Sequence, residues 1–257
     1  MPAEARLGFL IAGVQKAGTS ALHAYLGEVR DLQLPAVKEA HFFDDEEGVD
    51  WSAPDPARLH ALFADDGRLR GEATPITLYW PNALERAHDY NPAIRLVLLF
   101  RDPVERAFSH WRMEWSRRTE TLDFATAIRE GRARMAGAAP YPGFHRVFSY
   151  VERGFYGRQL ARARALFPRE QILCLPHWLL DRQPDEAVRR VCAFLGVAPP
   201  AAPLAPRRVR VAPDVAYPSS LTPADVAHLH DAFAAETRRF HDLAGAEDWR
   251  FGPGPGG

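Results

Sequence analysis

Two stretches of the chain each contain an apolar run followed by a helix-like sequence of apolar and polar residues. Each stretch therefore predicts a β-strand that leads into a helix. In the first, residues 8–14 form an apolar run, and residues 19–29 then carry apolar side chains at helical spacing. In the second, residues 94–100 are apolar and precede Asp102, a typical helix N-cap residue, and Pro103, which suits the first helical position. The pattern therefore predicts two strand–loop–helix segments.

The rest of the chain continues this alternation. Helical spacing recurs at residues 55–64, 123–135, 153–167, 184–196 and 223–243, and strand-like runs occur at residues 68–75 and 171–176. Strands that alternate with helices are typical of a mostly parallel sheet, so we expect an α/β fold. A proline-rich stretch at residues 197–220 is long enough to be suspected of function. We expect a single domain over residues 1–257, with a disordered tail at residues 252–257.

Composition limits the partners and the compartment. A formal net charge of −1 gives no global basic field that would favour nucleic acid or an anionic membrane, so any anion site must be local. Cys174 and Cys192 lie in apolar runs, where small buried side chains are the usual interpretation, rather than a disulfide or a metal site. No apolar run approaches the ~20 residues that span a bilayer, and no signal peptide is evident. We therefore expect a cytoplasmic protein without a bound metal.

The segment "GVQKAGTS", residues 13–20, has the form of a phosphate-binding loop with a displaced lysine. It keeps the G-x-x-x-x-G spacing and the hydroxyl residue of a nucleotide P-loop at Ser20, but Thr19 occupies the usual lysine position and the lysine is Lys16. Backbone N–H groups at the start of the following helix can still hold a phosphate. The displacement weakens the case for ATP and magnesium. Taken alone, the segment fits a glycine-rich turn equally well.

A second candidate anion site follows the strand predicted at residues 94–100. Arg101 stands at the end of this strand, and Ser109 lies seven residues after Asp102, about two helical turns later and on nearly the same side of the helix. One phosphate could contact both Arg101 and Ser109. The alternative is that Arg101 pairs with Glu105 and that Ser109 is an incidental helix residue.

Two further segments carry candidate chemistry. If "VKEAHFF" is extended, Glu39 and His41 project to one side and Lys38 to the other, which places a potential base beside a second titratable group. The alternative is a surface strand end without a chemical role. In the proline-rich stretch, Arg207 and Arg208 form either a solvated basic cluster or part of a lid over an anionic cofactor.

Taken together and in order, "LIAGVQKAGTSALHAYL", "VKEAHFFD", "GEATP" and "NPAIRLVLLFRDPVERAFSHW" resemble the sulfotransferases that use 3′-phosphoadenylyl sulfate, in particular the heparan sulfate glucosaminyl type and its bacterial relatives. The later "RGFYGRQLARARALFPREQILCLP" and "VCAFLG" are also similar to that family, so the resemblance covers about residues 8–200. It implies a sulfotransferase fold, with a P-loop-like parallel sheet flanked by helices, and an enzyme that transfers a sulfuryl group.

The resemblance also implies a set of cofactor contacts. The 5′-phosphosulfate of 3′-phosphoadenylyl sulfate is expected at residues 15–21, and Lys16 is expected on the phosphate and the bridging oxygen. The loop residues concerned are Lys16, Ala17, Gly18, Thr19, Ser20 and Ala21. Arg101 and Ser109 are expected to hold the 3′-phosphate. Arg207 and Arg208 are expected to contact the cofactor in place of the cysteine-bracketed basic loop of the Golgi enzymes. The product would be adenosine 3′,5′-bisphosphate.

For catalysis, Glu39 matches the glutamate that is the base in the 3-O-sulfotransferases of that family, and His41 is the reserve base. In this interpretation Glu39 takes the proton of the acceptor hydroxyl, while Lys16 offsets charge on the leaving 5′-phosphate. The family pattern is broken at Ala73, where the heparan enzymes have a lysine, and their membrane anchor is not found, so a stand-alone bacterial-type enzyme fits better.

The acceptor is left open by the sequence. A saccharide and a hydroxylated small molecule both fit, and Trp111 and Trp115 could stack a ring, although we favour a role for them in packing. The alternative within enzymes is a P-loop kinase or nucleotidase that uses ATP and magnesium. The non-enzymatic alternative is a nucleotide-binding regulatory module, which the presence of both Lys16 and Glu39 disfavours.

Overall fold

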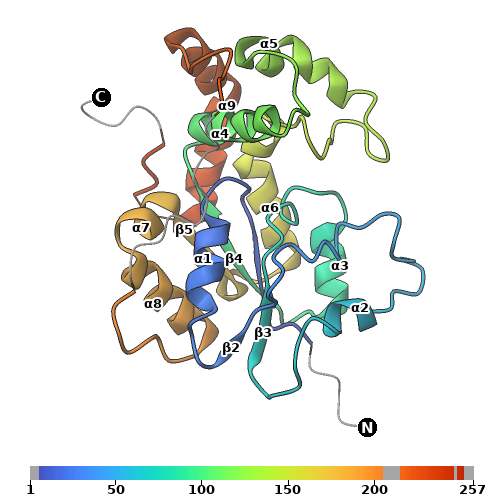
Figure 1. Ribbon diagram of the computed structural model, residues 1–257, viewed down its shortest axis with the longest axis vertical. Helices are drawn as coiled ribbons and strands as arrows, with labels where there is room; N and C mark the ends of the chain where they lie inside the picture. The colour runs from blue at the N-terminus through green and yellow to red at the C-terminus, as the bar shows by residue number, and fades with distance from the viewer. Residues whose placement is uncertain (1–5, 205–214, 246–247, 252–257) are drawn as a thin grey trace. The chain divides into compact units, whose positions relative to one another are not determined.

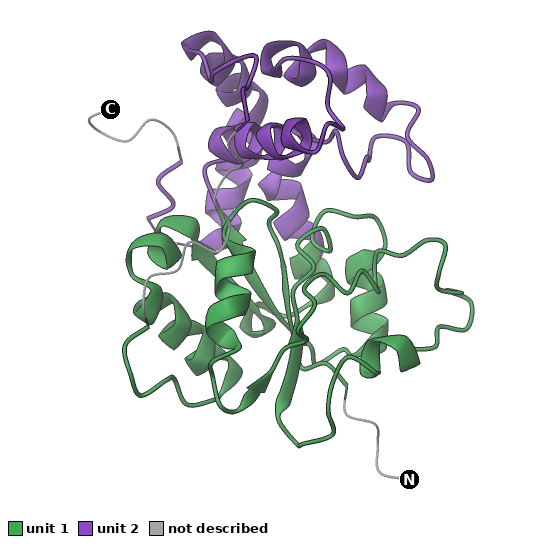
Figure 2. Ribbon diagram, viewed as in Figure 1, with its two compact units in different colours: residues 1–100, 163–210 green, residues 101–162, 211–257 purple. Residues whose placement is uncertain are grey.

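The structure, a computed structural model, describes residues 6–204, 215–245 and 248–251. It divides into two compact units, one made of residues 1–100 and 163–210 and the other of residues 101–162 and 211–257 (Figure 2). The single domain and the disordered tail expected from the sequence stay predictions, and the tail at residues 252–257 lies outside the described residues.

The first unit contains a five-stranded sheet in the order β2-β3-β1-β4-β5, and every neighbouring pair is parallel. Its strands are β1 (Phe9–Gly13), β2 (Leu32–Gln33), β3 (Leu69–Glu72), β4 (Arg95–Phe100) and β5 (Ile172–Pro176). All five residues of β1 and the last five of β4 are buried, which explains why these strands were readable as continuous apolar runs. The predicted α/β fold with a parallel sheet flanked by helices is confirmed.

Helices of the first unit lie on both sides of these strands. Figure 1 shows α1, α7 and α8 on one side and α2 and α3 on the other. Their bounds are α1 (Thr19–Leu26), α2 (Ala57–His60), α3 (Ala83–Tyr90), α7 (His177–Arg182) and α8 (Pro184–Leu195), with the short 3-10 helix η3 (Arg169–Gln171) before β5. Helix α3 has no counterpart among the predicted helices. Helix α6 (Tyr156–Leu166) begins in the second unit and ends in the first.

The second unit is helical and has its own apolar core. It holds α4 (Pro103–Ser116), α5 (Phe124–Ile128), η1 (Glu130–Met135), η2 (Glu152–Gly154) and α9 (Pro223–Ala244). Trp111 is fully buried in this core, and its indole N–H donates to the carbonyl of Leu122, 2.9 Å away. The single helix predicted at residues 123–135 is wrong, because the chain leaves helical geometry at Arg129, where φ is −110° and ψ is −88°, and continues as a 3-10 helix.

The ends of two strands position the candidate chemistry of the first unit. In a parallel sheet all carboxyl ends lie at one edge, and this edge is the usual ligand site of open α/β sheets. β1 leads into the loop that carries Lys16, and the neighbouring strand β3 ends at Glu72. The loop after β1 and the segment that contains Glu39 both belong to the first unit.

Candidate active site

The loop between β1 and α1 owes its shape to Gly18 and Lys16. Gly18 adopts φ +90°, a conformation that favours glycine, and a Cβ atom there would lie 3.1 Å from Leu180 Cδ2 and 3.2 Å from His177 Cδ2. Lys16 has φ 72°, which costs a non-glycine residue on the order of 1–3 kcal/mol. The loop therefore has a strained backbone that the surrounding residues keep in place, unlike an ordinary turn. Backbone strain of this kind is concentrated at functional sites.

The amino terminus of α1 suits an anion. Its N-cap residue is Gly18, which has no side chain to cap the helix, and its first turn has no acidic residue. The early N–H groups of a helix have no intrahelical acceptors, and the helix dipole adds positive potential at this end. Thr19 is buried, whereas Lys16, Gly18, Ser20 and Ala21 are partly exposed. The loop therefore fits a phosphate or sulfate group; Ala17 is fully buried, and its amide donates to the carbonyl of Val14 at 3.2 Å.

A cluster of charged residues surrounds Glu39. Its Oε1 accepts a hydrogen bond from Lys38 Nζ at 2.5 Å, and its Oε2 lies 3.5 Å from His41 Nε2. The other ring nitrogen of His41, Nδ1, lies 2.8 Å from Oδ2 of the fully buried Asp44. The imidazole is therefore held between two carboxylates.

The backbone of this cluster corrects the sequence prediction. An extended segment would have put Lys38 on the opposite side from Glu39 and His41, and that expectation is wrong. Glu39 and His41 have φ values of 69° and 48°, so the chain turns sharply there, and Lys38 folds back onto Glu39. Glu39 and His41 nevertheless lie close together, as predicted. The turn, and not the pleat of a strand, brings their side chains together.

Contacts within the cluster fix its charge state. Burial opposes ionisation of Glu39, but the hydrogen bond from His41 and the charge of Lys38 together lower its pKa to about 2. The hydrogen bonds of His41 to Asp44 and Glu39 raise its pKa to about 9 against the effect of burial. At neutral pH Glu39 is therefore a carboxylate and His41 an imidazolium.

The turn and α1 are electrostatically linked. Burial and then the charge of Lys38 lower the pKa of His23, which lies four residues after Thr19 on α1, while a hydrogen bond to Pro35 opposes the shift. The charge of Lys38 therefore reaches His23, in the last turn of the helix that follows the loop.

The second unit holds the other predicted cofactor residues. Asp102 caps α4 by accepting from the amides of Val104 and Glu105 at 2.9 Å, as the sequence predicted. Arg101 Nε and Nη2 both lie 3.0 Å from Glu105 Oε2, so the ion pair weighed as an alternative is formed. Ser109 is partly exposed on the same helix.

The predicted contacts at Arg207 and Arg208 lie outside the described residues.

Sequence reasoning missed three polar residues of the Glu39 cluster. Asp44 was not singled out, although its spacing of three residues from His41 is a signal that could have linked them. Glu72 and Thr74 were considered only as part of the family motif that is broken at Ala73, yet both are buried and hydrogen-bonded to each other at 2.7 Å. The cluster is therefore larger than the two titratable residues first singled out.

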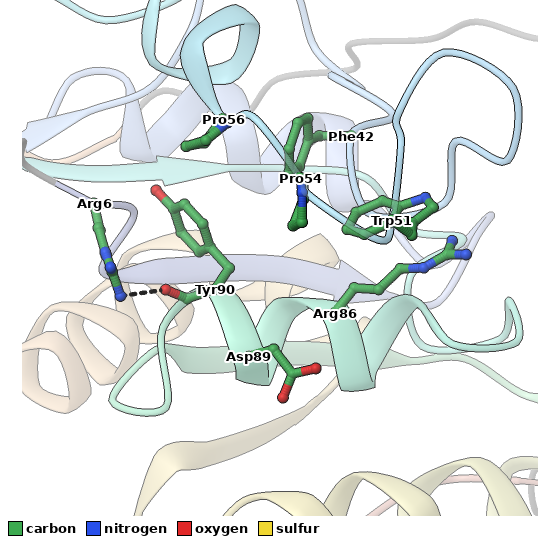
Figure 3. Close-up of a pocket in the computed structure, with 8 residues that line it drawn as sticks. All are labelled: Arg6, Phe42, Trp51, Pro54, Pro56, Arg86, Asp89 and Tyr90. Carbon is green, nitrogen blue, oxygen red and sulfur yellow. Dashed lines mark hydrogen bonds between the residues drawn. The ribbon is translucent and has the colours of Figure 1, made fainter.

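A cavity of about 320 Å³ lies elsewhere in the first unit (Figure 3). Its lining residues are mostly rings with a few charges, namely Arg6, Phe42, Trp51, Pro54, Pro56, Arg86, Asp89 and Tyr90. Arg86 stacks 4.1 Å over the ring of Trp51 and forms a two-bond pair with Glu46. None of the predicted catalytic or cofactor residues lines this cavity, although Phe42 directly follows His41.

The family model of the sulfotransferase domain matches residues 8–250. The chain belongs to the sulfotransferase family. This sulfotransferase is 31% identical over 191 residues to human heparan sulfate glucosamine 3-O-sulfotransferase 6, which covers 73% of this chain and 52% of the relative. It is 31% identical over 129 residues to the membrane-associated sulfotransferase kil1 of Dictyostelium discoideum, which covers 47% of this chain and 27% of the relative. The chain thus spans about half the length, or less, of these curated relatives.

Among solved structures, the sulfotransferase from Alicyclobacillus acidocaldarius is similar to this chain with a TM-score of 0.76 and 29% identity, over 96% of this chain and 99% of that one. The family resemblance and the sulfotransferase fold expected from the sequence are therefore confirmed. Within the described parts of this sulfotransferase, no helix combines the length and the apolar character needed to cross a membrane.

The charge state of His41 leads to a pH-dependent prediction. Because its folded pKa of about 9 is above the ordinary value of 6.5, the stabilisation from its ionic contacts is complete below about pH 6.5 and is lost as the pH rises through about 9. We expect the melting temperature of wild type to exceed that of His41→Gln most at pH 6, and the difference to vanish above pH 10. Thermal denaturation of both proteins at several pH values tests this; a difference that is constant from pH 6 to pH 10 would contradict it.

Proposed function

We propose that this protein transfers the sulfuryl group of 3′-phosphoadenylyl sulfate to a hydroxyl of a saccharide or small-molecule acceptor. The observation that carries the proposal is the ionised cluster of Glu39, His41 and Asp44 in the same unit as the lysine-bearing loop that leads through Gly18 into α1. The family match and the relatives named as heparan sulfate sulfotransferases support the reaction class.

In the proposal the loop holds the donor. When bound, 3′-phosphoadenylyl sulfate supplies an activated sulfuryl group joined to a 5′-phosphate leaving group. The amides at the start of α1 would donate hydrogen bonds to that anionic end, and Lys16 would stabilise the negative charge of the leaving 5′-phosphate. Arg101 and Ser109 on the second unit are assigned the 3′-phosphate, which requires Arg101 to exchange its carboxylate partner Glu105 for a phosphate. Both ligands are anions, so the guanidinium keeps a charge-assisted contact.

Glu39 is assigned the role of base. A carboxylate with a pKa of about 2 binds protons weakly in the resting state, but the proton of an attacking hydroxyl becomes acidic as its oxygen bonds to sulfur. A weak base is then sufficient at the transition state, and Glu39 is available in its ionised form at every pH above about 3. His41 carries a proton at neutral pH, which favours a role in orienting Glu39 over its role as the reserve base.

The acceptor is proposed only as a class. The curated relatives named for heparan sulfate glucosamine suggest a saccharide. The lysine of the heparan pattern is replaced here by Ala73, whose side chain is fully buried, so this position contributes no cation that would attract a polyanion. We therefore infer an acceptor that carries less negative charge than heparan sulfate, such as a neutral or lipid-linked sugar or a hydroxylated small molecule.

Calorimetric titration with three nucleotides tests the donor class. We expect adenosine 3′,5′-bisphosphate to bind without magnesium, and adenosine 5′-phosphate to bind at least tenfold more weakly because it lacks the 3′-phosphate that Arg101 recognises. ATP with magnesium should bind no better than adenosine 5′-phosphate. Magnesium-dependent binding of ATP together with indifference to the bisphosphate would instead identify a kinase or nucleotidase.

A further inference from the structure

A buried carboxylate at the end of β3 holds the backbone of the turn that carries Glu39. Glu72 is the last residue of this strand and is 2% exposed. Its Oε2 accepts a hydrogen bond from the hydroxyl of Thr74 at 2.7 Å, and the nearby backbone N–H of Ala40 favours the charged form of its carboxylate. Thr74 Oγ1 in turn accepts the backbone N–H of His41 at 3.4 Å. The amide of His41 is thus linked to β3 through Thr74, and the amide of Ala40 interacts with Glu72.

Burying this carboxylate is unfavourable for the fold alone. Burial and then the negative charge of Asp44 raise the pKa of Glu72 to about 7, while the hydrogen bonds from Thr74 and Ala40 and the charge of Lys38 oppose the rise. An apolar side chain would fill the same interior position without this cost. The polar groups that shift the pKa of Glu72 belong to the Glu39 cluster or to the turn that carries Glu39, which indicates a role for Glu72 in that cluster.

The turn requires an external restraint. Glu39 and His41 both adopt positive φ values, a conformation that side-chain-bearing residues hold only where the surrounding structure fixes it. Ala40 lies between them, so the interaction of its amide with Glu72 acts on both neighbours. The amide of His41 is bound through Thr74 at the adjacent position.

We propose that Glu72 is a positioning residue, which holds the 39–41 turn through the Ala40 amide and through Thr74 and thereby sets the place of the Glu39 carboxylate and the His41 ring. The inference rests on the proposed function only in naming Glu39 as the base. Glu72 itself needs no contact with the donor or the acceptor.

Substitution of Glu72 with two different side chains tests this role in the full chain. Glu72→Gln removes the charge but keeps an acceptor oxygen, whereas Glu72→Ala removes the acceptor as well. In an NMR titration of the His41 ring, we expect a pKa near 9 in wild type and in Glu72→Gln. In Glu72→Ala it should fall toward about 6.5, because the released turn separates His41 from Glu39 and Asp44. An equal His41 pKa in the two variants would overturn the proposal.

Kinetics supply a second measurement. With the donor and whichever acceptor supports turnover of wild type, Glu72→Ala should lower kcat about 100-fold, because the base is displaced, and leave the KM for the donor unchanged. Calorimetry should show the same affinity for adenosine 3′,5′-bisphosphate in the variant and in wild type. A loss confined to nucleotide affinity would count against a role in the turn.

A second pair of variants covers the case in which Glu72→Ala fails to fold. Thr74→Val removes the linking hydroxyl at similar volume, and Thr74→Ser keeps it. The proposal requires the His41 pKa to fall in Thr74→Val and to stay near the wild-type value in Thr74→Ser; an equal value in both would overturn it. If wild type does not bind the bisphosphate, the proposed function fails, while the NMR result still decides the role of Glu72.

Discussion

Glu39→Gln is expected to remove sulfuryl transfer and to spare nucleotide binding. The amide cannot accept the proton of the attacking hydroxyl, and loss of general-base catalysis typically costs a factor of about 10²–10⁴ in kcat. Because Glu39 lies on the 39–41 turn and not in the 15–21 loop, the affinity for adenosine 3′,5′-bisphosphate should change by less than about twofold. Radiolabelled transfer from 3′-phosphoadenylyl sulfate to a neutral glucosaminide, a heparan oligosaccharide and a phenol measures the first quantity, and calorimetry measures the second.

Glu47→Gln is the matched control for Glu39→Gln, because it makes the same substitution at an exposed residue of the following loop. Comparison of the two variants separates the loss of a catalytic base from a general loss of negative charge. The assignment of Glu39 as the base is wrong if Glu39→Gln transfers sulfuryl groups at the wild-type rate. In that case His41 would need to be deprotonated to act, and the activity of the variant should rise with pH as His41 loses its proton, at a lower pH than in wild type because the charge of Glu39 no longer raises the pKa of His41.

Lys16→Ala is expected to weaken both binding and turnover. A hydrogen bond to a charged group contributes about 1.5–3 kcal/mol, so the dissociation constant for adenosine 3′,5′-bisphosphate should rise about ten- to a hundredfold. Loss of stabilisation of the leaving 5′-phosphate should lower kcat by a further factor of about 10²–10³. The same transfer assay and titration measure these effects.

Arg30→Ala is the control for Lys16→Ala, since it removes one positive charge from an exposed position after α1. A long-range electrostatic effect would be similar in both variants and would weaken as the salt concentration rises. Equal effects of the two substitutions would therefore show that Lys16 acts through the general field and not through contact with the phosphate. The expected result is a loss specific to Lys16.

The parts of the fold that the sequence predicted are those with strong, continuous patterns. Strands β1, β4 and β5 are apolar because they are central or paired within a covered parallel sheet, and the predicted cap at Asp102 marks a real helix start. Helix α3 was missed because its eight residues include five polar or charged side chains and follow Asn82, which has a positive φ and provides no side-chain cap. The helix predicted at residues 123–135 failed at Arg129, whose guanidinium is bound to Asp225 on α9, a tertiary contact that no local pattern contains.

The candidate site was also predicted only in part. The order of the motifs identified Lys16, Glu39 and His41, but all three have positive φ values that the sequence did not suggest. The conformation that joins Glu39 to His41 depends on the end of β3, about thirty residues away in sequence, so local reasoning assigned an extended segment instead of a turn. Glu72 was missed for the same reason, because it acts on a turn distant in the chain, whereas Asp44 lies only three residues from its partner His41 and its pairing was simply not recognised.

The division of the chain into two units bears on how such an enzyme can diversify. In the proposed mechanism the loop, the base and its supporting carboxylates belong to the unit with the sheet, whereas Arg101 and Ser109 belong to the helical unit. Mutations on α4 can then alter which nucleotide is accepted without disturbing the residues that move the proton. Selection on recognition of the 3′-phosphate and selection on proton transfer would then act on separate sets of codons, whereas substitutions at Lys16 would change donor binding and chemistry together.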